Sequence, residues 1–248
     1  MLHLFTLKIV AAIIIFFLTI FSGLLPIRFA KRHVHILCLG DAFASGVFLS
    51  AALLHLLPDA TEGFQALKYN YPLAQLILIA TFIFLLILER GVAFYGKQHN
   101  SNNITPWLLV LVLTIHSLVE GAAIGITCST VSAAVIFFAI IAHKGSESFA
   151  LATNLYRHLF SSRKITRILL LFSLMTPLGV LIASSISGLL HTSSGCMSEP
   201  IFDAIAAGTF LYIGTEHMVE GSETYEGIGQ ILALITGIAL MAVVAIWV

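Results

Sequence analysis

The chain has 248 residues, of which 59% are hydrophobic and 10% are charged, and its formal net charge is zero. Soluble domains carry about 25% charged residues, so this composition excludes an ordinary soluble fold and predicts an all-α membrane protein. A chain with no excess of positive charge is not expected to bind nucleic acid. At roughly 20 residues per span, the length accommodates about eight transmembrane helices in a single polytopic domain, residues 1–248.

Apolar runs separated by short polar segments predict the eight spans. Proline and glycine mark several boundaries: Pro26 and the basic run after it are expected to end the first helix, Pro58 follows the second, and Pro177 and Gly179 interrupt the sixth. In chain order the predicted helices are Leu4–Ile27, Leu39–Leu57, Pro72–Phe94, Trp107–Gly125, Val131–Tyr156, Ile168–Leu190, Ile201–Val219 and Gly227–Val248.

The basic residues indicate how these helices are oriented. Nine fall in loops on one side (Arg28, Lys31, Arg32, Arg90, Lys97, Arg157, Arg163, Lys164 and Arg167), two fall on the other (Lys8 and Lys68), and Lys144 lies within a span. Cytoplasmic loops carry an excess of Lys and Arg. The richer side is therefore predicted to be cytoplasmic, and both termini are predicted to be extracytoplasmic.

Two adjacent spans, residues 106–126 and 131–156, carry the same pair of ionisable residues deep inside. His116 is followed four residues later by Glu120, and His143 is followed four residues later by Glu147. Residues i and i+4 lie on one face of an α-helix, one turn apart. Ionisable side chains in the middle of apolar spans are costly, so they indicate a functional site.

Residue numbering predicts how the two pairs meet. The pairs Glu120/His143 and His116/Glu147 have the same midpoint, 131.5, so in a symmetric antiparallel helix pair the two members of each pair lie level. The turn between the helices is expected at 127–130. The upper of these two layers lies roughly 14 Å from the turn, at 1.5 Å per residue. Half the hydrocarbon thickness is about 15 Å, so the four side chains are expected near the membrane midplane.

Imidazole and carboxylate together are the ligands of zinc and similar divalent first-row metals. One divalent cation neutralises the two carboxylates, and Lys144 adds a positive charge that can pair with Glu147 at i+3. A second cation would leave a surplus of positive charge in a poor solvent. We therefore predict one metal ion per site, with Lys144 as the charge substitute for a second.

The simpler alternative is that each histidine is a hydrogen-bonded packing residue and not a metal ligand. Gly121 and Gly125 indicate close helix packing.

Ligand-type residues also occur near both ends of a possible pathway. His55 and Asp59 lie i,i+4 apart at the outer end of the second helix, and they are candidates for the pathway entrance. Glu216 and His217 lie near the inner end of the seventh helix, and they are candidates for the exit. Each pair can also be interpreted as an interfacial anchor.

The stretches HSLVEGAAIG and HKGSESFAL, which contain these two His/Glu pairs, resemble the paired signatures of the ZIP family of divalent metal transporters. FASGVFLSAALLHLLPDA and GTFLYIGTEHMVE in the second and seventh helices extend the resemblance over essentially the whole chain. The resemblance implies eight helices with both ends outside, an elevator-like movement, and import of Zn²⁺, or of Fe²⁺, Mn²⁺ or Cd²⁺, toward the cytosol.

Within that resemblance, His116, Glu120 and Glu147 match positions that bind the transported metal, and the position of His143 is commonly metal-facing. Ser117 stands where many members have Asn, and Lys144 stands where binuclear members have Asp. Both departures weaken a second metal site, and the subgroup with His-Lys in the fifth helix looks closest.

Two alternatives from other classes remain at the level of the sequence. An intramembrane zinc metalloprotease would need an HExxH motif, which the chain lacks. A non-transporting membrane metal sensor is compatible with the same residues. The lipid bilayer, a divalent metal ion and a homodimer partner are the expected interactions, and the plasma membrane is favoured over an organelle membrane.

Overall fold

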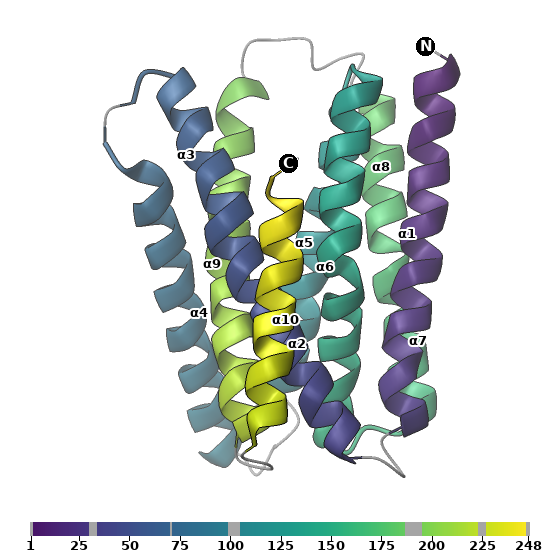
Figure 1. Ribbon diagram of the computed structural model, residues 1–248, viewed down its shortest axis with the longest axis vertical. Helices are drawn as coiled ribbons and strands as arrows, with labels where there is room; N and C mark the ends of the chain where they lie inside the picture. The colour runs from purple at the N-terminus through teal and green to yellow at the C-terminus, as the bar shows by residue number, and fades with distance from the viewer. Residues whose placement is uncertain are drawn as a thin grey trace.

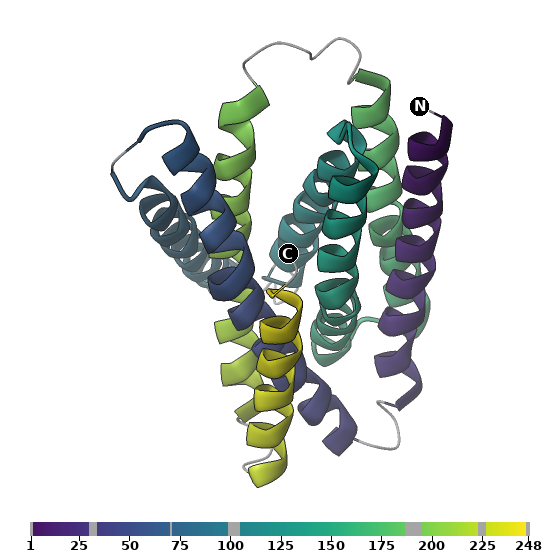
Figure 2. The same cartoon turned by 45° about the horizontal axis from the view of Figure 1, so that its top comes forward.

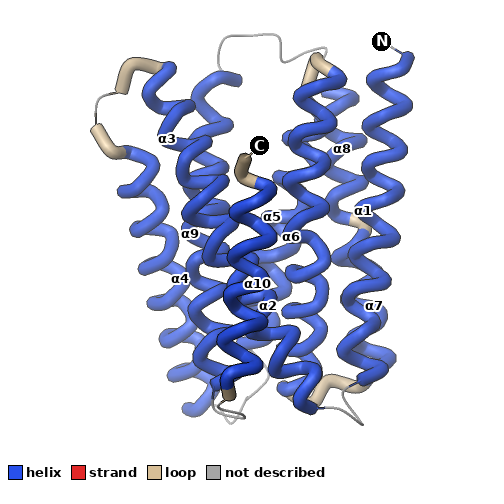
Figure 3. Tube along the Cα trace, in the orientation of Figure 1, coloured by secondary structure: helices blue, strands red, loops and turns tan. Residues whose placement is uncertain are grey.

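The computed structural model describes residues 2–29, 34–69, 71–98, 105–186, 195–222 and 227–246. Every regular element in these ranges is a helix (Figures 1 and 3). In chain order they are α1 (Leu2–Phe29), α2 (Val34–Ala51), the π-helical turn η1 (Ala52–Leu56), α3 (Leu57–Ala66), α4 (Leu73–Gln98), α5 (Thr105–Ile126), α6 (Thr130–Arg157), α7 (Ser162–Ser173), α8 (Met175–Ile186), α9 (Gly195–Ser222) and α10 (Ile228–Val244).

Within the described ranges these elements form eight rods, as the sequence predicts, because α2, η1 and α3 are continuous and α7 is followed directly by α8. Six rods are long and apolar enough to cross a membrane, and α10 is a shorter apolar helix. This architecture is that of an integral membrane protein. The upper end of the bundle in Figure 1 holds the N-terminus and the α5–α6 turn, and the lower end holds the start of α2.

Prolines end or interrupt fewer of these helices than the sequence analysis predicted. The second helix does not end at Pro58: the chain continues as helix to Ala66, and Pro58 occupies the first turn of α3. The preceding π turn makes this possible, because the Leu57 N–H bonds to the Ala52 carbonyl, five residues back. Pro26 likewise lies inside α1 rather than at its end. Pro177 does interrupt its rod, because a proline cannot bond the carbonyl of Ser173, and the helix breaks at Leu174.

The rods are divided into two bundles, which separate clearly when the molecule is tilted (Figure 2). The first bundle contains α1, α5, α6, α7 and α8, and its closest pairings are α5 with α8 and α1 with α6. The second bundle contains α2, η1, α3, α4, α9 and α10, and it is built on the pairing of α2 with α10 and of α9 with α2 and α4. α6 is the main bridge, because it also packs against α2.

Glycines set the position of α5 in the first bundle. A Cβ on Gly121 would collide with the Thr176 carbonyl on α8, and a Cβ on Gly179 would collide with the Leu118 carbonyl on α5. A Cβ on Gly125 would lie 2.6 Å from Cβ of Ala183, which is also too close. The close packing predicted from Gly121 and Gly125 is thus confirmed, and it fixes the rotation and depth of the helix that carries His116 and Glu120.

Candidate metal site

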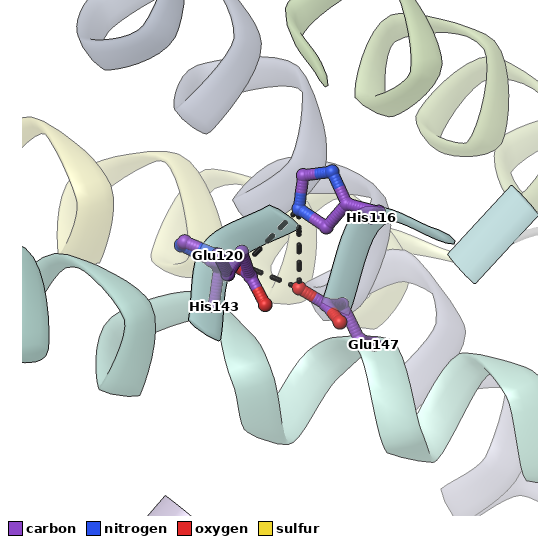
Figure 4. Close-up of side chains that lie close together, drawn as sticks. All are labelled: His116, Glu120, His143 and Glu147. Carbon is purple, nitrogen blue, oxygen red and sulfur yellow. Dashed lines mark hydrogen bonds and ion pairs between the residues drawn. The ribbon is translucent and has the colours of Figure 1, made fainter. Parts of the chain in front are cut away.

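The four side chains singled out by the sequence meet between α5 and α6 (Figure 4). His116 and Glu120 come from α5, and His143 and Glu147 come from α6. All four are buried. One nitrogen or oxygen atom from each lies within 4.8 Å of the others, so the antiparallel pair brings together every residue of the predicted cluster.

Two imidazole nitrogens and two carboxylate oxygens face one another at short range. Nε2 of His143 lies 2.6 Å from Oε1 of Glu120 and 3.5 Å from Oε1 of Glu147. Nε2 of His116 lies 3.2 Å and 3.7 Å from the same two oxygens. Ligands about 2.1 Å from a tetrahedral zinc ion are about 3.4 Å apart, so these atoms already lie near the spacing that such an ion requires.

Two of these atoms lack a hydrogen bond. Among the described residues, neither Nε2 of His116 nor Oε1 of Glu147 has a partner with hydrogen-bond geometry, although both atoms are buried. Buried polar atoms are nearly always satisfied, and an exception calls for an explanation such as an ion-binding role. The donor set and the orphaned atoms both fit a bound divalent cation.

Lys144 holds the opposite oxygens of the same two carboxylates. Its fully buried Nζ lies 2.5 Å from Oε2 of Glu120 and 2.8 Å from Oε2 of Glu147, and it donates to Oγ of Ser117 at 2.7 Å. The i+3 contact with Glu147 follows the prediction, whereas the contacts with α5 were not predicted. Each carboxylate therefore presents Oε2 to the ammonium and Oε1 to the imidazoles. With neutral histidines the site has a formal charge of −1.

A pocket in the upper half of the molecule reaches this site. It is lined by His55 and Asp59 and extends to His116, Glu120 and His143. Nδ1 of His55 lies 3.0 Å from Oδ2 of Asp59. The two predicted entrance residues thus share one cavity with three of the four predicted metal ligands. The entrance residues are not part of the four-residue cluster.

The same pocket includes an acidic residue that the sequence reasoning missed. Asp203, on α9, lines the cavity together with Asp59. The sequence did contain an indication of this residue, because Asp203 lies just inside the predicted span Ile201–Val219, and carboxylates are unusual within membrane-spanning segments. α9 also contributes Phe210, whose ring packs against both histidines of the cluster.

The predicted exit residues lie lower on α9, away from the cluster. Glu216 is half-buried near the lower end of that helix. The side chain of His217 lies outside the described residues. The structure therefore brings together the four predicted ligands and links them to the predicted entrance. Among the described residues, Glu216 is not part of the four-residue cluster.

Comparison with known proteins identifies relatives along nearly the whole chain. The model of a family described as "ZIP Zinc transporter" matches residues 5–106 and 95–245. The chain is 30% identical to Zinc transporter 11 of Arabidopsis thaliana, with 98% of this chain and 86% of that protein aligned. It is 27% identical to Zinc transporter ZIP1 of Takifugu rubripes (97% of both chains) and 26% identical to Zinc transporter ZIP1 of Homo sapiens (94% and 89%).

Proposed function

The chain belongs to the ZIP family of zinc transporters, and from this premise we propose that His116, Glu120, His143 and Glu147 hold the metal ion as it crosses the membrane. The observation that carries the proposal is the convergence of their four donor atoms within 4.8 Å of one another. The histidines supply neutral nitrogen ligands and the glutamates supply anionic oxygen ligands, which suits Zn²⁺.

A single ion fits the charge of this site. One Zn²⁺ changes the formal charge from −1 to +1, whereas a second would raise it to +3 in a medium that stabilises charge poorly. Lys144 already occupies the side of the carboxylates that a second ion would need. The site is therefore proposed to be mononuclear. Fe²⁺, Mn²⁺ and Cd²⁺ accept the same ligand types, and they are candidate substrates beside zinc.

The pathway is proposed to run from the upper end to the lower end. Zn²⁺ enters past His55, Asp59 and Asp203, binds the four ligands, and leaves past Glu216 and His217. Arg157 and the exposed Arg163, two of the basic residues predicted to be cytoplasmic, lie at the lower end, where α6 ends and α7 begins (Figure 1). Lys/Arg-rich ends face the cytoplasm, so this direction is import, with both termini outside.

The distribution of residues between the bundles supports an elevator-like movement. All four ligands belong to the first bundle, whereas His55, Asp59, Asp203 and Glu216 belong to the second. A movement of the first bundle along the second would carry the bound ion from the entrance residues toward the exit residue. Domain movements of this kind alternately expose a site placed near the membrane midplane.

Metal flux into vesicles tests the proposal. In vesicles reconstituted with the purified chain, we expect zinc to accumulate, and His116→Ala or Glu147→Ala should reduce flux to the level of empty vesicles while the protein remains in the membrane. His3→Ala and Glu62→Ala remove the same chemical groups at exposed positions and should leave flux unchanged. Normal flux in either site variant would refute the assignment of ligands.

The same assay separates the transporter from the remaining alternatives. Family membership already argues against an intramembrane metalloprotease, because ZIP family members are transporters and not enzymes. A membrane metal sensor would bind zinc without accumulating it in vesicles. The plasma-membrane location and the homodimer stay predictions from the sequence.

A further inference from the structure

Two aromatic side chains of the second bundle, Phe48 and Phe210, lie below the pocket that reaches the metal site. On α9, the lining residue nearest the lower end is Ala206, and Phe210 lies one turn below it. On the rod formed by α2 and η1, the lowest lining residue is His55, and Phe48 lies about 10 Å below it at 1.5 Å per residue. Phe48 and Phe210 are both fully buried.

Phe210 touches both imidazoles of the site. Its ring centroid lies 4.3 Å from that of His116, with the rings tilted by 46°, and 5.1 Å from that of His143, in an edge-to-face arrangement. Phe48 packs behind it at 5.3 Å. Ring pairs at these separations attract each other and have preferred orientations, so Phe210 restricts how each imidazole can rotate about its side chain.

These contacts occur at the boundary between the bundles. Phe48 and Phe210 belong to the second bundle, whereas His116 and His143 belong to the first. Above the aromatic pair the cavity lining includes the polar side chains His55, Asp59 and Asp203 among apolar ones. At the level of the pair, two large apolar rings pack against each other. A hydrated cation cannot pass such a barrier without losing its water in an apolar environment, which is very costly.

We propose that Phe210, supported by Phe48, is the floor of the metal pathway. It has two effects: it holds both imidazoles so that each Nε2 faces the carboxylates, and it closes the site toward the lower end. It is a positioning residue and does not ligate the metal. The closing role rests on the proposed transport function, because a slide of the first bundle along the second would break the ring contacts and open the lower side.

Two substitutions separate the effects. Phe210→Leu retains most of the apolar volume but removes the aromatic face, so zinc binding should weaken about tenfold, the size of effect found for residues that orient metal ligands. Phe210→Ala also removes the volume, so flux should gain a component that rises linearly with zinc concentration and does not saturate. Phe210→Val serves the same purpose if the Ala variant does not give folded protein.

The readouts are the zinc dissociation constant of the purified chain in detergent and the concentration dependence of zinc flux in vesicles. The matched control is Phe64→Leu or Phe64→Ala. Phe64 is a buried phenylalanine of the second bundle that packs in a separate cluster with Ala60, Ala74 and Ala204. The control variants should keep both the wild-type dissociation constant and fully saturable flux.

Each role can be overturned separately. An unchanged dissociation constant in Phe210→Leu would overturn the positioning role, since a merely structural phenylalanine would not alter metal affinity. Fully saturable flux in Phe210→Ala or Phe210→Val would overturn the closing role. If the unmodified chain binds zinc without accumulating it, the proposed function fails, and the dissociation constants still decide the positioning role.

Discussion

At the scale of single residues, the chemistry of the site depends on how two glutamates divide their oxygens. Lys144 bonds Oε2 of both, and the imidazoles face Oε1 of both. A carboxylate in an apolar medium needs a compensating charge. The lysine supplies one such charge, which leaves the empty site at −1, and one divalent ion would bring the site to +1.

The charge of Lys144 leads to a prediction about stoichiometry. Lys144→Asp replaces the ammonium with a third carboxylate, which changes the formal charge of the empty site from −1 to −3. We expect the number of zinc ions bound per chain to rise from one to two, measured by calorimetric titration or by elemental analysis of the purified protein.

Lys68→Asp is the control for that experiment, because Lys68 is exposed and the substitution makes the same change in net charge. It should leave a single equivalent bound. If Lys144→Asp also binds one equivalent, Lys144 does not substitute for a second metal ion.

At the scale of helices, the site depends on the close packing of α5 against α8. Gly121 and Gly179 allow the backbones to approach so closely that each faces a carbonyl of the other helix. Small residues are the usual means of bringing transmembrane helices together. Because α5 is held in this way, His116 and Glu120 face α6, where the other two ligands lie.

Because of this packing, we expect that adding even one methyl group at Gly121 destabilises the folded protein. Gly121→Ala places a Cβ against the Thr176 carbonyl, and overpacking of this kind costs typically 1–3 kcal/mol. We expect a lower unfolding temperature in detergent and weaker zinc binding, because α5 must shift away from α8.

Gly91→Ala gives a matched control. Gly91 lies within α4, and no atom of the described residues approaches within 4 Å of the position of its Cβ. Since alanine is the better helix former, the unfolding temperature should stay the same or rise slightly. Equal unfolding temperatures for Gly121→Ala and Gly91→Ala would contradict the close α5–α8 contact.

At the scale of the whole molecule, an ion pair between a partly exposed arginine and a buried aspartate joins the two bundles near the lower end. Nη2 of Arg157, at the end of α6, lies 2.5 Å from Oδ2 of Asp41 on α2. Asp41 is 1% exposed and Arg157 is 25% exposed. A bond between a buried carboxylate and a guanidinium contributes more than a surface pair does, because water competes less for both groups.

Arg157→Gln is therefore expected to destabilise the folded protein by about 1–3 kcal/mol, since it removes a charged partner from a buried carboxylate. The double variant Asp41→Asn/Arg157→Gln should lose less stability than the single variant, because no uncompensated charge stays buried. Thermal unfolding in detergent measures both. Arg163→Gln, at an exposed position, should have little effect, and a single variant as stable as this control would show that the pair does not hold the bundles together.

Much of the architecture could be predicted from the sequence because the membrane restricts the choices. Backbone groups in lipid must be satisfied within helices, so apolar runs translate into rods, and the eight predicted rods are present. The boundaries were less predictable. Pro58 did not end its helix, because a local π turn rearranged the backbone hydrogen bonds, and a sequence pattern does not show that rearrangement.

The candidate ligands were predictable for a related reason. Charges are so unfavourable in an apolar span that His116, Glu120, His143 and Glu147 stand out, and the fixed geometry of a helix determines which of them share a face. Their convergence follows from one short turn between neighbouring helices. Their role as metal ligands stays a prediction that the flux assay tests.

What the sequence by itself determined was thus the membrane class, the rods, and the local pairing of the four candidate ligands. Only the tertiary structure decided that Asp203 joins His55 and Asp59 in the pocket, that Lys144 bridges both glutamates, and that Phe210 lies against both histidines. The physical reason is distance along the chain. Most of these contacts join helices that are far apart in sequence, and helical periodicity determines which residues share a face of one helix but not which helix packs against that face.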